Sequence, residues 1–121
     1  MRILNKIFWG LFVLFSLLLS CKSAKIEKKD IDLNAMADGV YIGKFKHMNE
    51  ADVKVVIKNH RIEEIKLLKL DATKFGQKAK DSVPQRIIRF QTPYVDAVSG
   101  ATEASNVIMN ACVKALSVEN K

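Results

Sequence analysis

The sequence predicts a small α+β domain in which a curved antiparallel sheet is packed by one or two helices. Apolar and polar residues alternate with a period of two over Val53–Ile57, which is typical of a strand with one buried face. The dipeptide Asn59-His60 follows as a turn signal before a second apolar run. From Ala101 to about Leu116, apolar residues recur at every third or fourth position, as on a helix with one buried face.

The predicted strands follow the turn signal Asp38-Gly39. Gly39–Met48 contains valine, tyrosine, isoleucine and phenylalanine at the density of a strand. After the alternating run and its turn, Arg61–Leu70 predicts a third strand, and its apolar phase slips between Ile62 and Ile65, which predicts a bulge or a strand end. Three strands in an antiparallel meander are the simplest arrangement.

The connection between the sheet and the last helix is predicted in three pieces. Asp71–Asp81 is polar, which indicates an irregular segment or a loose helical turn. Ser82, with Pro84 just beyond it, predicts the start of a helix, which ends at Thr92-Pro93. Tyr94–Val98 is short and strand-like.

Composition narrows the class of protein. The chain has 121 residues, 49% hydrophobic and 27% charged, which excludes overall disorder. Two cysteines are too few for a disulfide framework, and no Cys/His cluster has the spacing of a zinc site. The net charge is +7, but basic residues alternate with acids without interleaved aromatics, so we expect no nucleic-acid binding. A single folded domain over Asp38–Lys121 is expected.

The first residues have a composition of their own. Met1–Lys6 is basic, and Ile7–Leu19 has no charge but is shorter than the roughly 20 apolar residues of a membrane span. This combination predicts a secretory signal peptide over residues 1–20. Leu18-Leu19-Ser20-Cys21 resembles the lipobox of bacterial lipoproteins, in which cleavage before the cysteine is coupled to its lipidation. We therefore expect an extracytoplasmic domain anchored to a bacterial membrane through Cys21, the alternative being a free cysteine beside an uncleaved anchor.

The next segment separates the lipid from the domain. Lys22–Ala37 is rich in lysine and acids, so residues 21–37 are predicted to be the lipidated cysteine and a flexible, solvated tether, with a short turn near Asp32–Met36. Removing the signal peptide takes away two basic residues and no acid, which lowers the net charge from +7 to +5 and favours anionic surfaces or an acidic partner. Cys112 is predicted to be a small buried residue of the last helix.

Asp96-Ala97-Val98-Ser99-Gly100-Ala101-Thr102 stands immediately before that helix. Ser99 is suited to cap the helix, and Gly100 lets another group approach the backbone closely. Thr102 falls in the first helical turn, where unpaired N–H groups and the helix dipole stabilise a phosphate. The alternative is that Ser-Gly does no more than cap the helix.

The segment matches the pattern Asp-x-x-Ser/Thr-Gly-Ala-Thr and resembles the FMN-binding domain family, whose members include components of the sodium-translocating NADH:quinone reductase and of the related Rnf complex. Asp38–Gly43 is similar to the opening strand of that family, and Gln91-Thr92 and Ser105 also fit. The resemblance covers Asp38–Leu116. The chain departs from the family in Lys44–Glu50, which has no glycine where many members are glycine-rich, and in the use of Asn-His for the usual Asp-Gly turn.

The resemblance implies that a flavin transferase, using FAD and magnesium, attaches FMN to Thr102 through a phosphoester bond. Asp96, Ser99, Gly100 and Ala101 match the other motif positions and are carried over as residues of the cofactor site. Asp96 then orients the loop or helps to place the metal during the transfer, and the alternative is a simple turn-forming residue. No metal site is expected in the chain itself.

The implied function is that of an extracytoplasmic, membrane-anchored flavoprotein that carries electrons through covalent FMN, with membrane redox proteins as partners and without substrate turnover of its own. The alternatives are a lipoprotein module that binds FMN or another anionic ligand reversibly, and a structural lipoprotein domain without flavin. The two histidines, His47 and His60, are expected to be exposed. Four aromatic residues either stack on the flavin ring or fill the core: Tyr41, Phe45, Phe90 and Tyr94.

Overall fold

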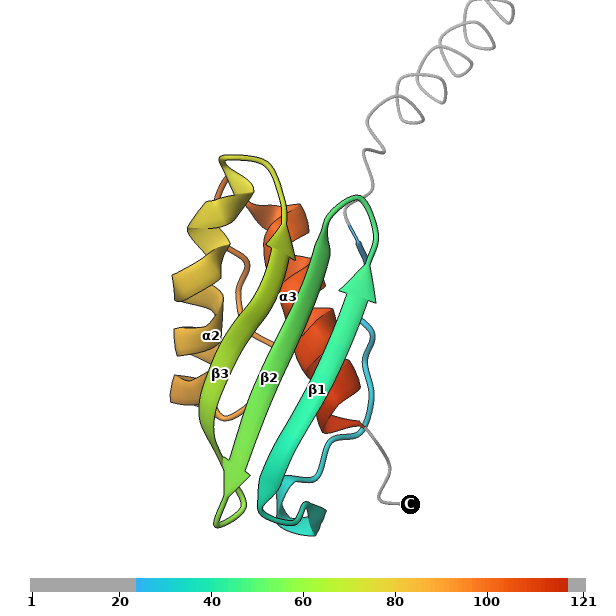
Figure 1. Ribbon diagram of the computed structural model, residues 1–121, viewed down its shortest axis with the longest axis vertical. Coiled ribbons are helices and arrows are strands. Elements are labelled where there is room, and N and C mark those ends of the chain that lie inside the picture. The colour runs from blue at the N-terminus through green and yellow to red at the C-terminus, as the bar shows by residue number, and fades with distance from the viewer. Residues whose placement is uncertain (1–23, 118–121) are drawn as a thin grey trace, which may run out of the picture.

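The computed structural model describes residues 24–117 (Figure 1). A three-stranded antiparallel sheet of order β1-β2-β3 is covered on one face by two helices, so the predicted α+β class and the meander are confirmed. The strands are β1 (Gly39–Lys46), β2 (Glu50–Lys58) and β3 (Arg61–Asp71). The helices are the short 3-10 turns η1 (Leu33–Ala35) and η2 (Gly76–Lys78), then α2 (Ala79–Phe90) and α3 (Thr102–Leu116).

The core lies between the sheet and α3. Alternate residues of β2 face it and are buried, namely Ala51, Val53, Val55 and Ile57. Helix α3 packs across β1 and β2, and α2 packs beside it on β3. Gly43 permits the close approach of α3 to β1, because a Cβ there would lie 1.9 Å from the carbonyl oxygen of Ala111.

Strand β3 contains two bulges. Register shifts leave Glu63 and Leu68 without partners in β2. The first falls between Ile62 and Ile65, so the predicted bulge is confirmed, whereas the second was not predicted. The expected turn is also confirmed, since Asn59-His60 joins β2 to β3 with both residues at positive φ, 52° and 61°.

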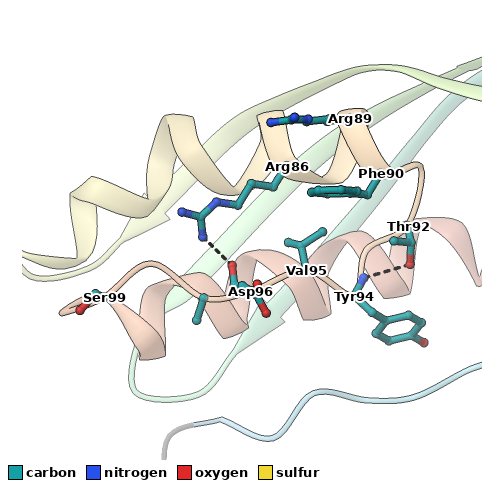
Figure 2. Close-up of a pocket in the computed structure, with 9 residues that line it drawn as sticks. Arg86, Arg89, Phe90, Thr92, Tyr94, Val95, Asp96 and Ser99 are labelled. Atoms are coloured by element: carbon teal, nitrogen blue, oxygen red, sulfur yellow. Dashed lines mark hydrogen bonds between the residues drawn. The ribbon is translucent and has the colours of Figure 1, made fainter.

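Two predictions for the connecting segment were wrong. Helix α2 begins at Ala79 rather than at Ser82, because η2 leads directly into it, and Pro84 therefore lies inside the helix. The helix ends as predicted, with Gln91 in the left-handed conformation. Tyr94–Val98 is not a strand, because it belongs to the loop between α2 and α3 (Figure 2), and no strand within residues 24–117 pairs with it.

Residues 24–37, named here the N-terminal strap, do not form the expected solvated tether. Ala24 and Met36 are buried. Three further apolar side chains pack against the core, those of Ile26, Ile31 and Leu33. The turn expected near Asp32–Met36 is confirmed as η1, where the Asp32 carboxylate accepts a hydrogen bond from the Asn34 N–H at 3.0 Å.

The predicted signal peptide over residues 1–20 and the lipidated Cys21 lie outside the described residues. Within residues 24–117, no helix combines the length and the apolar character needed to cross a membrane.

Candidate functional site

The motif lies at the end of a loop, residues 91–101, that connects α2 to α3 (Figure 2). The first residue of this loop, Gln91, is held in place by the hydrogen bonds of its side-chain amide. The Oε1 atom accepts a hydrogen bond from the Ile62 N–H at 2.8 Å, and Nε2 donates to the carbonyls of Ile62 at 3.0 Å and Ile88 at 2.6 Å. These bonds tie the end of α2 to the start of β3 and so set where the loop begins.

The other end of the loop is fixed by Ser105, which is fully buried in α3. Its hydroxyl accepts a hydrogen bond from the Val98 N–H at 3.0 Å and donates to the Ala101 carbonyl at 2.7 Å. The Ala101 N–H closes the turn by donating to the Val98 carbonyl at 2.9 Å. Gly100 adopts a φ of +80° within this turn, a conformation that other residues adopt only with strain.

Thr102 lies in the first turn of α3, as the sequence predicted, and the structure shows that it is the first residue of the helix and is exposed. The prediction that Ser99 caps this helix was wrong. The cap position is held by Ala101, whose side chain has no polar atom, and α3 has no side-chain cap. The N–H groups of the first turn, next to the Thr102 hydroxyl, therefore remain available to an anion.

A groove of about 780 Å³ opens between α2 and the loop (Figure 2). It extends from Thr92 to Ser99, three residues before Thr102. Its volume lies in the range of about 300–1,000 Å³ that is typical of ligand pockets. Its wall has a basic and aromatic character that comes mainly from Arg86, Arg89 and Phe90. Tyr94 also borders the groove, but its ring points away from α2, toward residues 24–37 (Figure 2).

Of the two expectations for Phe90, stacking on a flavin ring or filling the core, the second was wrong, and Arg86 was not expected in this site. Phe90 does not fill the core, because it is 62% exposed at the end of α2. Arg86 reaches across to the loop, where Nη1 donates a hydrogen bond to the Asp96 carbonyl at 2.7 Å (Figure 2). Arginine and phenylalanine near the end of an amphipathic helix are ordinary surface residues, so no local sequence signal marks this contact.

The carboxylate of Asp96 is exposed, and the loop is held at this residue through its backbone carbonyl. Neither expected role of the Asp96 carboxylate is supported by a contact. Within residues 24–117, no group of three or more His, Cys, Asp or Glu side chains is placed to hold a metal ion.

Glu103, beside Thr102, connects three segments of the chain. Its Oε2 accepts a hydrogen bond from the Ala24 N–H at 2.6 Å, and Oε1 lies 2.7 Å from His47 Nδ1 and 3.1 Å from the Met48 N. Burial raises the pKa of this carboxyl, but the hydrogen bonds from Ala24, His47, Asn49 and Met48 outweigh burial and hold the pKa below its ordinary value of 4.5. The ionised carboxylate thus joins the strap and the β1–β2 hairpin to the start of α3.

The strap closes the side of α3 that faces away from the groove. Asn110, fully buried, accepts a hydrogen bond from the Glu27 N–H at 2.8 Å and donates to the Lys25 carbonyl at 2.7 Å. Asn106 donates to the Ala24 carbonyl at 2.8 Å. These two asparagines hold the strap against α3, and the strap covers the side of the helix that the sheet does not. Almost the whole circumference of α3 is therefore buried.

The remaining candidates are structural. Tyr41 and Phe45 pack against the core, and both His47 and His60 are exposed, as expected. Cys112 is buried as predicted, and burial raises the pKa of its thiol to about 12.

These features define a small α+β domain whose uncapped helix terminus lies at the end of a cationic, aromatic groove. The chain belongs to the FMN-binding domain family, whose family model matches residues 48–117, from the β1–β2 hairpin to the end of α3. The resemblance expected over Asp38–Leu116 is thus confirmed from residue 48 onward. Searches of curated proteins and of solved structures found no match.

Proposed function

We propose that the chain is an extracytoplasmic, lipid-anchored flavoprotein that carries electrons through FMN esterified to Thr102. Membership of the FMN-binding family supports flavin as the ligand. The observation that carries the attachment site is the position of Thr102, an exposed hydroxyl on the first residue of an uncapped helix. A phosphate there is stabilised by first-turn N–H groups and by the helix dipole without a nearby arginine.

The groove fits the rest of the cofactor. It begins at Ser99, three residues from the proposed ester, and its volume of about 780 Å³ is sufficient for a tricyclic ring. Phe90 offers aromatic surface to such a ring, and Arg86 and Arg89 offer positive charge. These residues hold and orient the ring and shield one side of it from water.

When bound, FMN supplies one- and two-electron chemistry, and the protein sets its position and electrostatic environment. The arginines of the groove favour a ring that gains negative charge on reduction. The groove is open to solvent, which allows a redox partner to approach the ring. A carrier that exchanges electrons with membrane redox proteins fits this arrangement better than an enzyme with an enclosed substrate site.

The attachment is tested by expressing the chain with a flavin transferase, FAD and magnesium. We expect flavin fluorescence to stay with the polypeptide after denaturing electrophoresis, and mass spectrometry to place the added mass on the peptide that contains Thr102. Thr102→Ala should abolish the bound fluorescence while leaving the fold unchanged. Thr102→Ser is the matched control, because it keeps a hydroxyl at the same helix position.

The other possible results of this experiment each support a different function. Flavin that copurifies with the native protein but leaves on denaturation contradicts covalent attachment and supports a reversible binding module. The open, cationic groove is the feature that favours this second function. A native protein without flavin, in cells that flavinylate other proteins, contradicts the carrier role and supports a structural lipoprotein domain.

A further inference from the structure

The proposed flavin site and the start of the strap lie at the same end of the molecule. Figure 1 shows the start of α3, the β1–β2 hairpin and the segment that joins β3 to η2 together at this end. The strap is tied to it by the hydrogen bond of 2.6 Å from the Ala24 N–H to Glu103. Cys21 precedes Ala24 by three residues, and three residues span at most about 10 Å. A lipid on Cys21 therefore keeps this end close to the membrane surface.

The same end exposes two large apolar side chains. Met48 is 69% exposed in the β1–β2 hairpin, and Phe75 is 65% exposed just before η2. Neither side chain is needed for the core. Exposed apolar side chains on loop tips, rimmed by cations, are typical of a surface that enters the interfacial layer of a bilayer.

The charges around these side chains suit anionic headgroups. Lys46, Lys74 and Lys78 are exposed beside them, and Lys78 Nζ lies 5.6 Å from the centre of the Phe75 ring. Among the acids of this end, Asp71 is exposed, whereas Glu50 lies 3.3 Å from the Lys69 ammonium group. Lysines with long apolar stems can lie along a membrane surface while their ammonium groups reach the phosphates.

We propose that this end is the membrane-facing surface of the anchored protein, with Phe75 and Met48 in the interfacial layer of an anionic bilayer. The inference rests on the proposed lipidation of Cys21 and does not depend on flavin attachment. It places Thr102, the proposed attachment point of FMN, at the end of the domain that faces the membrane. The strap, by binding α3, sets this orientation.

The chain provides a matched pair of reporter positions. Phe90 is 62% exposed, and Arg89 lies 5.6 Å from its ring centre, much as Lys78 lies from that of Phe75. Phe75 precedes α2 and Phe90 is its last residue, so the 12 residues of the helix, which span about 18 Å, lie between the two positions. Trp9 is the one tryptophan of the sequence, so Phe75→Trp and Phe90→Trp, each in a Trp9→Phe background, give single reporters at opposite ends of the helix.

The full chain is expressed in a bacterium that processes lipoproteins, extracted in detergent and reconstituted into anionic phosphatidylglycerol–phosphatidylcholine vesicles that carry brominated lipids. We expect quenching of the tryptophan at position 75 to exceed that at position 90 by about twofold or more, because interfacial groups enter only about 5–10 Å. Met48→Trp is a second reporter at the same end and should behave like Phe75→Trp. Cys21→Ala should leave the domain folded but without lipid and with residues 1–20 uncleaved, because cleavage before the cysteine is coupled to its lipidation, and mass spectrometry of the intact chain checks both.

Two results would contradict the proposed orientation, each for a different reason. Protein that floats with the vesicles but shows equal quenching at both positions, or more at position 90, contradicts the membrane-facing surface while leaving the anchor intact. This result is also expected if the apolar tips contact a membrane protein instead of lipid. Failure of the unsubstituted chain to float contradicts lipidation itself, and with it the inference.

Discussion

The two flanks of the loop over residues 91–101 differ in how their polar groups are satisfied. Toward the strap, where the Tyr94 ring points in Figure 2, the Tyr94 hydroxyl lies 2.8 Å from the Lys29 carbonyl and accepts a hydrogen bond from the Lys29 N–H at 2.6 Å. Toward α2, the groove leaves Arg89 and Phe90 exposed. One flank is sealed by the polypeptide itself, and the other keeps its cationic and aromatic groups available, so the ligand is expected on the α2 flank.

The largest expected effect comes from opening the sealed flank. Asn110→Leu replaces the amide by an apolar side chain of similar size and leaves the Glu27 N–H and the Lys25 carbonyl without their partner. We expect the free energy of unfolding to fall by about 2–4 kcal/mol in urea titrations, since each unpaired buried group costs about 1–3 kcal/mol. Asn106→Leu, which removes a single bond, is the control and should cost about 1 kcal/mol. Equal losses in the two variants would contradict the assignment of Asn110 as the main attachment of the strap.

A smaller effect is expected from Glu103→Gln, which removes the charge that joins the strap to α3. Hydrogen bonds to charged groups are worth more than neutral ones, so we expect a loss of about 1–2 kcal/mol at pH 7. Because the pKa of Glu103 is lowered in the folded state, its stabilisation is complete above the ordinary value of 4.5 and is lost as the pH falls through the folded value.

The pH dependence of stability distinguishes the contribution of the Glu103 charge from that of the shape of its side chain. Thermal unfolding of the original chain should lose stability as the pH is lowered below about 4.5, and Glu103→Gln should follow a flatter curve. Parallel curves would mean that the charge of Glu103 does not hold the strap.

The smallest effect on stability is expected on the open flank. Arg86→Met removes one hydrogen bond, to the Asp96 carbonyl, at a partly exposed position, so the free energy of unfolding should change by less than about 1 kcal/mol. In flavin-loaded protein, however, iodide should quench the ring more readily, because the groove loses a wall residue that also positions the loop. Arg89→Met, which leaves the Asp96 contact intact, is the control. Unchanged quenching in Arg86→Met would place the ring outside the groove.

The elements with a local pattern could be predicted from the sequence. The alternation in β2, the Asn59-His60 turn and the bulge near Glu63 depend on neighbouring residues, and all three were confirmed. The position of Thr102 in the first turn of α3 followed in the same way, from helical periodicity and a preceding glycine.

The features that were missed depend on contacts between distant residues. Asn110 binds the strap across a sequence separation of 83 to 85 residues, and a polar segment with scattered isoleucines has no period that would reveal it. Ser99 has the right chemistry for a cap, but Ser105 closes the turn from within the helix and moves the cap to Ala101. The sequence predicted the start of α2 at Ser82, three residues too late. The helix instead continues directly from the 3-10 turn η2 and has no capping side chain that would mark its start.

The burial of Cys112 has a consequence for the proposed location outside the cytoplasm. Its pKa of about 12 leaves almost no thiolate at neutral pH, and α3 must separate from the sheet before an oxidant can reach the sulfur. If Cys21 carries lipid, the mature chain has no other thiol. The protein can then remain in an oxidising compartment without crosslinking to its neighbours and without help from disulfide-exchange enzymes.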